Sequence, residues 1–83
     1  MKTYRKIATV QAKLFEEGDE DGTIHTSGIG GEHEIKVPYV STLENQKHLS
    51  HGFGNDYICV GINGERWLVK KDIFERTYEE VTL

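Results

Sequence analysis

An Asn63-Gly64 step between two apolar runs, residues 56–62 and 65–70, constrains the fold of this 83-residue chain more than any other feature. Asn-Gly in such a position predicts a β-hairpin with a two-residue type I′ turn, because both central residues of that turn need a positive φ. The register of this turn would place three largely apolar pairs on one face: Ile62–Glu65, Val60–Trp67 and Ile58–Val69. We expect that face to turn toward the core.

The opposite face of the predicted hairpin is more polar. It would carry the pairs Gly61–Arg66, Cys59–Leu68 and Tyr57–Lys70. Tyr57, Arg66 and Lys70 would then lie together on the surface of the domain. An aromatic ring beside two cations can stack on a planar group and hold an anionic one. We therefore name these three residues as a candidate patch for binding a ligand or partner.

The rest of the chain supplies further expected elements. Residues 2–15 largely alternate polar and apolar side chains, which predicts a long, half-buried strand. Residues 35–43 predict an extended segment interrupted at Pro38, and a proline within a strand favours a sheet edge or a bend. A helical turn is expected at residues 72–77, with Asp72 as its N-cap. The extended end that follows could pair with the first strand and close the sheet.

Residues 16–34 read as a long, acidic, glycine-rich loop, within which residues 23–26 could form a short strand. The segment contains seven acidic residues and no Lys or Arg, whereas the whole chain has 14 acidic and 10 basic residues and a net charge of -4. An acidic loop can compete for basic sites on a partner, and we name five of its residues as a candidate interaction loop: Glu16, Glu17, Asp19, Glu20 and Asp21. Duplex nucleic-acid binding is not expected, because it needs a concentrated basic face.

Three glycines near the end of this loop invite comparison with phosphate-binding loops. Gly28, Gly30 and Gly31 could bring backbone amides close to a phosphate, but the segment lacks the Lys-Ser/Thr that completes a P-loop. They enter the candidate list as ligand-binding residues for a small nucleotide-type ligand. No cofactor is predicted.

Histidine and cysteine placement gives no expectation of a metal site. His48 and His51 have a spacing that could present two ligands, and His25 and His33 lie in the acidic loop. Zinc needs three or four ligands, and Cys59 is the chain's single cysteine. A single cysteine also excludes an intrachain disulfide, which makes a reducing cytosol the expected compartment.

Enzymatic activity is left open, with a binding role favoured. Nucleophilic catalysis needs a nucleophile, a base and an orienting group. The sequence offers nucleophiles by residue type alone, namely Ser41, Thr42, Ser50 and Cys59, and it contains no nucleophile-elbow or Cys-His motif. We therefore predict no catalytic residues.

Length and hydropathy complete the fold prediction. Eighty-three residues suit a single small domain, residues 1–83, close to the size at which one core is only just sufficient. No apolar run is long enough for a membrane-spanning helix, and no signal peptide is expected. We predict a small α+β, mainly-β fold: a twisted antiparallel sheet or partly rolled barrel of about four to five strands, with one short helix near the C-terminus. Exposed strand edges would favour a homo-oligomer.

Several motifs resemble the small PGDYG-type proteins of bacteriophages and prophages. Residues 54–58 carry a Gly-Asn-Asp-Tyr step, residues 61–67 a Gly-x-x-Gly-Glu turn, and residues 71–79 a Lys-Asp-Ile-Phe-x-x-Thr-Tyr-Glu ending. Residues 4–12 are similar to the basic opening strand of these proteins, and residues 38–44 to a middle segment of some members. The resemblance covers about half the chain. It implies a compact, mostly-β phage protein that acts in the host bacterial cytoplasm, and it supplies no catalytic residues.

Three functional hypotheses follow from the resemblance and the residues together. The leading one is a small phage accessory protein that binds and neutralises a host defence or regulatory protein without catalysis. The second is a module, or sponge, that binds a nucleotide or nucleotide-derived signal. The third is a structural or assembly component of the phage.

Overall fold

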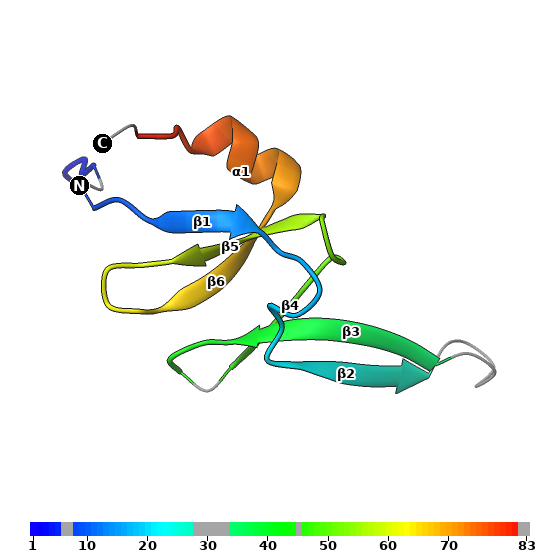
Figure 1. Ribbon diagram of the computed structural model, residues 1–83. Coiled ribbons are helices and arrows are strands. Elements are labelled where there is room, and N and C mark those ends of the chain that lie inside the picture. Colours follow the sequence, from blue (N-terminus) through cyan, green and yellow to red (C-terminus); the bar gives the residue numbers. More distant parts are fainter. Residues whose placement is uncertain (6–7, 28–33, 45, 82–83) are drawn as a thin grey trace.

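The computed structural model describes residues 1–5, 8–27, 34–44 and 46–81. In chain order its elements are β1 (Gln11–Leu14), β2 (Gly22–Ser27), β3 (Glu34–Ser41), β4 (Lys47–Leu49), β5 (Asp56–Val60), β6 (Arg66–Lys70) and α1 (Lys71–Thr77). The strands form two antiparallel three-stranded sheets, in the orders β1-β5-β6 and β2-β3-β4. The first sheet lies between α1 and the second sheet (Figure 1).

The predicted α+β, mainly-β fold class with a short helix near the C-terminus is confirmed. Within the described residues the strands divide between two open sheets instead of forming one sheet or barrel. The segment expected as a long loop at residues 16–34, with a short strand allowed at 23–26, contains the six-residue strand β2, which pairs along its whole length with β3. The β2–β3 hairpin extends beyond β4, which makes the molecule elongated, with extents of 50 × 26 × 25 Å (Figure 1).

The β5–β6 hairpin is present, but its predicted register is wrong by one residue. Ile58 lies opposite Leu68, and Cys59 lies opposite Trp67. Gly64 N donates to Gly61 O at 3.0 Å, Gly61 N donates to Glu65 O at 2.8 Å, and Gly64 has a φ of 78°. This is a three-residue loop with a bulge at the glycine, which accepts Asn-Gly as readily as the type I′ turn does.

The shifted register changes which side chains share a face. Successive residues of a strand point to opposite faces, so Tyr57, opposite Val69, lies on one face of the hairpin. Arg66 and Lys70 lie on the other face, with Val60 and Asp56 as their partners. The predicted surface patch of Tyr57, Arg66 and Lys70 therefore does not form.

The first strand and the C-terminal segment that includes the helix both differ from prediction. In the described part of residues 2–15 the expected strand is limited to β1, and residues 78–81 form no strand pairing with it. The helix starts one residue earlier than predicted. Lys70 is its N-cap, with no side-chain capping bond, and Asp72 lies in the first turn instead of at the cap.

Pro38 lies in the middle strand of its sheet, contrary to the expected edge position or strand break. β3 continues through Pro38, which faces Thr23 of β2. On the other side β4 ends at Leu49, opposite Tyr39, so Pro38 lies one position beyond the last strand pair. Its carbonyl still accepts from Ser50 N at 2.9 Å. The missing amide hydrogen therefore falls where the ladder has already ended.

A small apolar core holds the two sheets together. It consists of Phe15, Val40, Ile58 and Leu68, all buried. Phe15 also tilts against the Phe53 ring, with 5.4 Å between centroids. A core of this size suits a domain near the lower limit for independent folding.

Polar contacts also join the sheets beside this core. Leu68 N, on the outer edge of β6, donates to His48 Nδ1 of β4 at 3.1 Å. The Arg66 guanidinium pairs with the Asp21 carboxylate, which precedes β2. The histidine bond satisfies a backbone donor that a β6 edge strand would otherwise present for pairing. β6 is therefore covered at this point by the second sheet.

Candidate functional site

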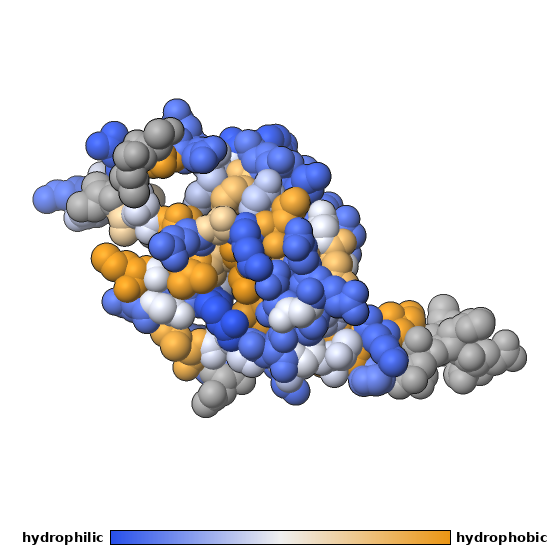
Figure 2. Space-filling model, in the orientation of Figure 1, coloured by the Kyte–Doolittle hydropathy of each residue, from blue (hydrophilic) through white to orange (hydrophobic). Residues whose placement is uncertain are grey.

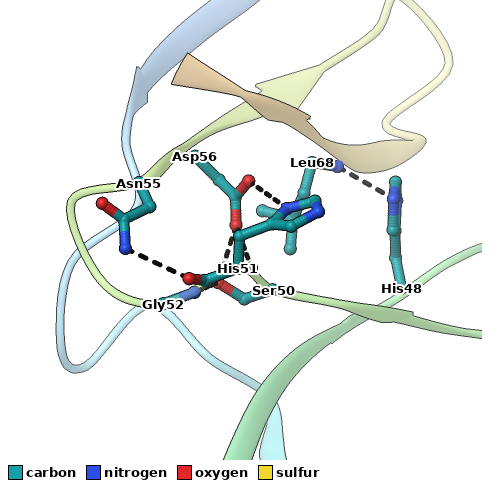
Figure 3. Close-up of polar contacts among 7 residues, drawn as sticks. All are labelled: His48, Ser50, His51, Gly52, Asn55, Asp56 and Leu68. Carbon is teal, nitrogen blue, oxygen red and sulfur yellow. Dashed lines mark hydrogen bonds and ion pairs between the residues drawn. The ribbon is translucent and has the colours of Figure 1, made fainter. Parts of the chain in front are cut away.

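A buried carboxylate organises the turn between β4 and β5 (Figure 3). Asp56 is fully buried, and one of its oxygens, Oδ2, accepts from Ser50 Oγ and from His51 N, both at 2.7 Å. The other oxygen, Oδ1, lies 2.9 Å from His51 Nδ1. With an ionised carboxylate, which only accepts hydrogen bonds, the hydrogen of this contact is on His51 Nδ1. We call Ser50, His51 and Asp56 the Asp56 cluster.

The local sequence explains this turn. Gly52 and Gly54 have φ values of 114° and 79°, a region that favours glycine. Asn55 N donates to Gly52 O at 3.1 Å, and Asn55 Nδ2 donates to His51 O at 3.1 Å. The chain thereby folds back so that Ser50 and His51 meet the first residue of β5.

The Asp56 cluster contains the residue types of a hydrolytic triad, but they are hydrogen-bonded to one another in a different way. Ser50 Oγ donates to the Asp56 carboxylate and accepts from Gly52 N, whereas a serine nucleophile is activated by a hydrogen bond to a histidine base. The His51 side chain is 61% exposed, so its ring is open to solvent on the side away from Asp56. In this arrangement the cluster holds the turn and orients one imidazole.

The outer side of His51 borders an open depression of about 530 Å³, lined also by Asn55, Lys70, Lys71, Asp72 and Glu75. The structure thus places Lys70 beside the Asp56 cluster. Tyr57 lies beneath α1, where its hydroxyl donates to Glu75 Oε2 at 3.4 Å. Partial burial and the nearby Glu75 carboxylate raise the pKa of Tyr57, so this hydroxyl keeps its proton at neutral pH.

The five residues of the candidate interaction loop have different surroundings. Asp19 accepts from Lys13 Nζ at 2.8 Å and from Glu16 N at 3.0 Å, and these bonds lower its pKa. Asp21 accepts from Ser41 N, and this bond, followed by the Arg66 contact, lowers its pKa.

Three glutamates complete the candidate loop. Glu20 accepts from Gly18 N, whereas the side chains of Glu16 and Glu17 are exposed. Two of the five carboxylates therefore stabilise the fold, and an interaction role for the loop stays a prediction.

The remaining residues considered from the sequence are the loop glycines and the histidines. Gly28, Gly30 and Gly31 lie outside the described residues, as does His33. In the part of the chain that the structure describes, no three His, Cys, Asp or Glu side chains gather as metal ligands. His48 and His51 have separate partners, Leu68 N and Asp56.

Cys59 is fully buried in β5, and burial raises the pKa of its thiol to about 11. We expect the native thiol to react with a disulfide reagent at about pH 8 at least ~100-fold more slowly than the urea-unfolded chain, because the thiolate is the reactive form. The measurement is the rate of colour release from dithiobis-nitrobenzoate in each state. A native rate within tenfold of the unfolded rate would contradict this placement.

A groove that the sequence did not reveal lies along the first sheet. It has a volume of about 880 Å³ and runs between residues 8–12, which include the start of β1, and residues 74–81, which include the end of α1. Tyr57, Phe74 and Tyr78 stack along it, with centroid separations of 4.1 Å and 4.5 Å and interplanar angles of 15° and 12°. The Phe74 and Tyr78 pair has helical i,i+4 spacing, which is the one sequence signal that could have indicated it.

Strand β1 contributes Gln11 and Ala12 to the lining of this groove. Phe15 N donates to Asp56 O at 2.9 Å, and with the β1–β5 register this makes Lys13↔Ile58 a hydrogen-bonded pair. The alternation of an antiparallel ladder then directs the N–H and C=O groups of Ala12 and Leu14 away from β5. Among the described residues, no backbone group pairs with them. We call this edge and its groove the β1 groove.

Figure 2 shows apolar residues grouped over the first sheet, interleaved with polar surface. Tyr78 and Val81, at one end of the β1 groove, are 39% and 60% exposed.

Against known proteins, no family model, curated sequence or solved structure gives a significant match to this chain. None of the helices formed by the described residues has the length and apolar character needed to cross a membrane.

Proposed function

We propose that this chain is a small phage accessory protein that binds and neutralises a host protein without catalysis, and that it does so at the β1 groove. The observation that carries the binding mode is the outer edge of β1, which no other described strand pairs with, beside an aromatic groove. An extended segment of a partner can add to such an edge, with main-chain hydrogen bonds giving affinity and adjoining side-chain contacts giving specificity. The phage and host parts of the proposal rest on the motifs at residues 54–58, 61–67 and 71–79.

The edge geometry favours strand addition over a flat contact. Ala12 and Leu14 offer two N–H and two C=O groups in the spacing that a fourth strand needs. The side chains of both residues lie on the same face as Tyr57, because Leu14 is opposite Tyr57 in the register. A strand added at this edge would therefore also present every second side chain to the aromatic stack.

The nucleotide-binding hypothesis gains no comparable observation. Its glycines lie outside the described residues, and the Arg66 guanidinium is engaged by Asp21. A homo-oligomer joined through the β1 edge is the competing use of the same surface. Light scattering on the pure protein separates the two, since a dimer that buries β1 would leave the edge closed to a partner.

The experiment is affinity capture from a bacterial lysate with three forms of the protein: the native chain, Ala12→Pro and Ala12→Val. Proline removes the outward N–H of residue 12 without removing a hydrogen bond to β5, and edge strands tolerate it. Valine keeps the N–H and enlarges the side chain as a control. We expect a stoichiometric host protein to be retained by the native and valine forms and at least ~10-fold less by the proline form, since one lost main-chain bond is combined with a steric block. Equal retention by all three forms would contradict strand addition.

A further inference from the structure

The charged residues that line the β1 groove all have the same sign. Its lining consists of Ala8, Thr9, Val10, Gln11, Ala12, Tyr57, Phe74, Glu75, Tyr78, Glu79, Glu80 and Val81. Three of these are carboxylates, and none is a lysine or arginine. All three carboxylates belong to α1 or to the chain after it, so they lie on the rim that faces β1.

These three carboxylates have few electrostatic partners among the described residues. Glu75 Oε2 accepts one long hydrogen bond from the neutral Tyr57 hydroxyl. Glu79 and Glu80 are exposed, and within the described residues neither has a cation within ion-pair distance. The rim therefore carries three charges whose counter-charges the described chain does not supply.

We propose that the occupant of the β1 groove is an extended segment with lysine or arginine at alternate positions, taken from the partner protein. This inference rests on the proposed function and specifies the chemistry of its ligand. A strand paired with β1 places every second side chain on the face of Ala12, Leu14 and Tyr57. Long side chains on that face would project toward the rim formed by α1 and the chain after it.

Lysine and arginine fit both features of the groove. Their aliphatic stems can lie along the stack of Tyr57, Phe74 and Tyr78, while their charged ends reach the carboxylates. A cation over an exposed aromatic face gains further attraction from the ring. An acidic segment or a nucleic-acid phosphate would instead meet three like charges, in a chain whose net charge is already -4.

The test uses three blocked eight-residue peptides in which valine alternates with lysine, glutamine or glutamate. Affinity is measured by amide NMR titration of the native protein at low and moderate salt. We expect the lysine peptide to bind about 10-fold more tightly than the glutamine peptide, because each of three surface ion pairs increases the affinity by less than tenfold. The glutamate peptide should bind most weakly. Added salt should reduce the advantage of lysine.

Two triple variants decide where the charge preference originates. Glu75→Gln, Glu79→Gln and Glu80→Gln together remove the rim charges. Glu44→Gln, Glu65→Gln and Asp72→Asn together make the same change in net charge at sites outside the groove lining. We expect the first variant to bind the lysine and glutamine peptides equally and the second to keep the native preference. Retention of the preference in the first variant, or equal loss in both, would overturn the proposal.

This design separates the inference from the proposed function. The Ala12→Pro form should bind the peptides at least ~10-fold more weakly if strand addition operates. If peptides bind in an Ala12-dependent way but show no lysine preference, the basic ligand is wrong and strand addition stands. If no peptide binds and capture of a host protein does not depend on Ala12, strand addition at the β1 groove is wrong as well.

Discussion

Replacing Asp56 with alanine is expected to lower the free energy of unfolding by roughly 3 kcal/mol or more, since each hydrogen bond to a charged group is worth about 1.5–3 kcal/mol. The buried carboxylate accepts from the Ser50 hydroxyl, the His51 amide and the His51 ring. Alanine leaves all three donors without their acceptor. Because small domains have total stabilities of only about 5–15 kcal/mol, the variant should be largely unfolded under mild heating.

Urea unfolding followed by circular dichroism measures this effect. Asp72→Ala is the matched control, because its side chain is 63% exposed and its nearest cation, Arg76, is 4.0 Å away. We expect the control to change stability by no more than about 0.5 kcal/mol. A loss below about 1 kcal/mol for Asp56→Ala would show that the cluster does not organise the β4–β5 turn.

Phe15→Ala is expected to destabilise the protein by about 3–5 kcal/mol, the range for a fully buried phenylalanine. Its ring is completely buried between the two sheets, and the other buried apolar residues in the described part of the chain are Val40, Ile58, Leu68 and Cys59. Removing it leaves a cavity that these side chains cannot fill.

The neighbouring ring provides the comparison. Phe53 contacts Phe15 but is 43% exposed, so Phe53→Ala should cost substantially less. Thermal and urea unfolding of both variants test the placement of the core. A larger loss for Phe53→Ala than for Phe15→Ala would mean that the sheets pack differently.

The sequence predicted the individual strands and the helix better than it predicted the strand register and the arrangement of the sheets. Hydrophobic patterning found the β5–β6 hairpin, and turn chemistry placed its loop at Asn63-Gly64. The register was wrong because Asn-Gly suits both a two-residue turn and a three-residue loop with a bulge, and these differ by one residue. This shift of one residue places Arg66 and Lys70 on the face opposite Tyr57, so the predicted patch does not form.

The division into two sheets depends on contacts that lie far apart in sequence. His48 bonds to Leu68 N, and Asp21 pairs with Arg66 across 45 residues. Neither contact has a local sequence signal. Pro38 was expected at an edge because a proline lacks the ladder donor, yet β4 is short enough for the middle strand to tolerate it.

The β1 groove escaped prediction for a related reason. The segment after α1 was expected to pair with the first strand, which would have filled this space. Phe74 and Tyr78 stack on Tyr57 instead, and the chain continues alongside β1 without pairing to it. The aromatic stack joins residues from β5, from α1 and from the position just after α1, so only the tertiary fold brings it together.

Amide hydrogen exchange at β1 tests the central claim most directly. In the free protein the Ala12 and Leu14 amides point away from β5 and should exchange fast, whereas the Lys13 amide, which faces Ile58, should be protected. On binding the captured host protein or the lysine peptide, the Ala12 and Leu14 amides should become protected, with Lys13 little changed. Fast exchange at Ala12 and Leu14 in the saturated complex would contradict strand addition at the β1 groove.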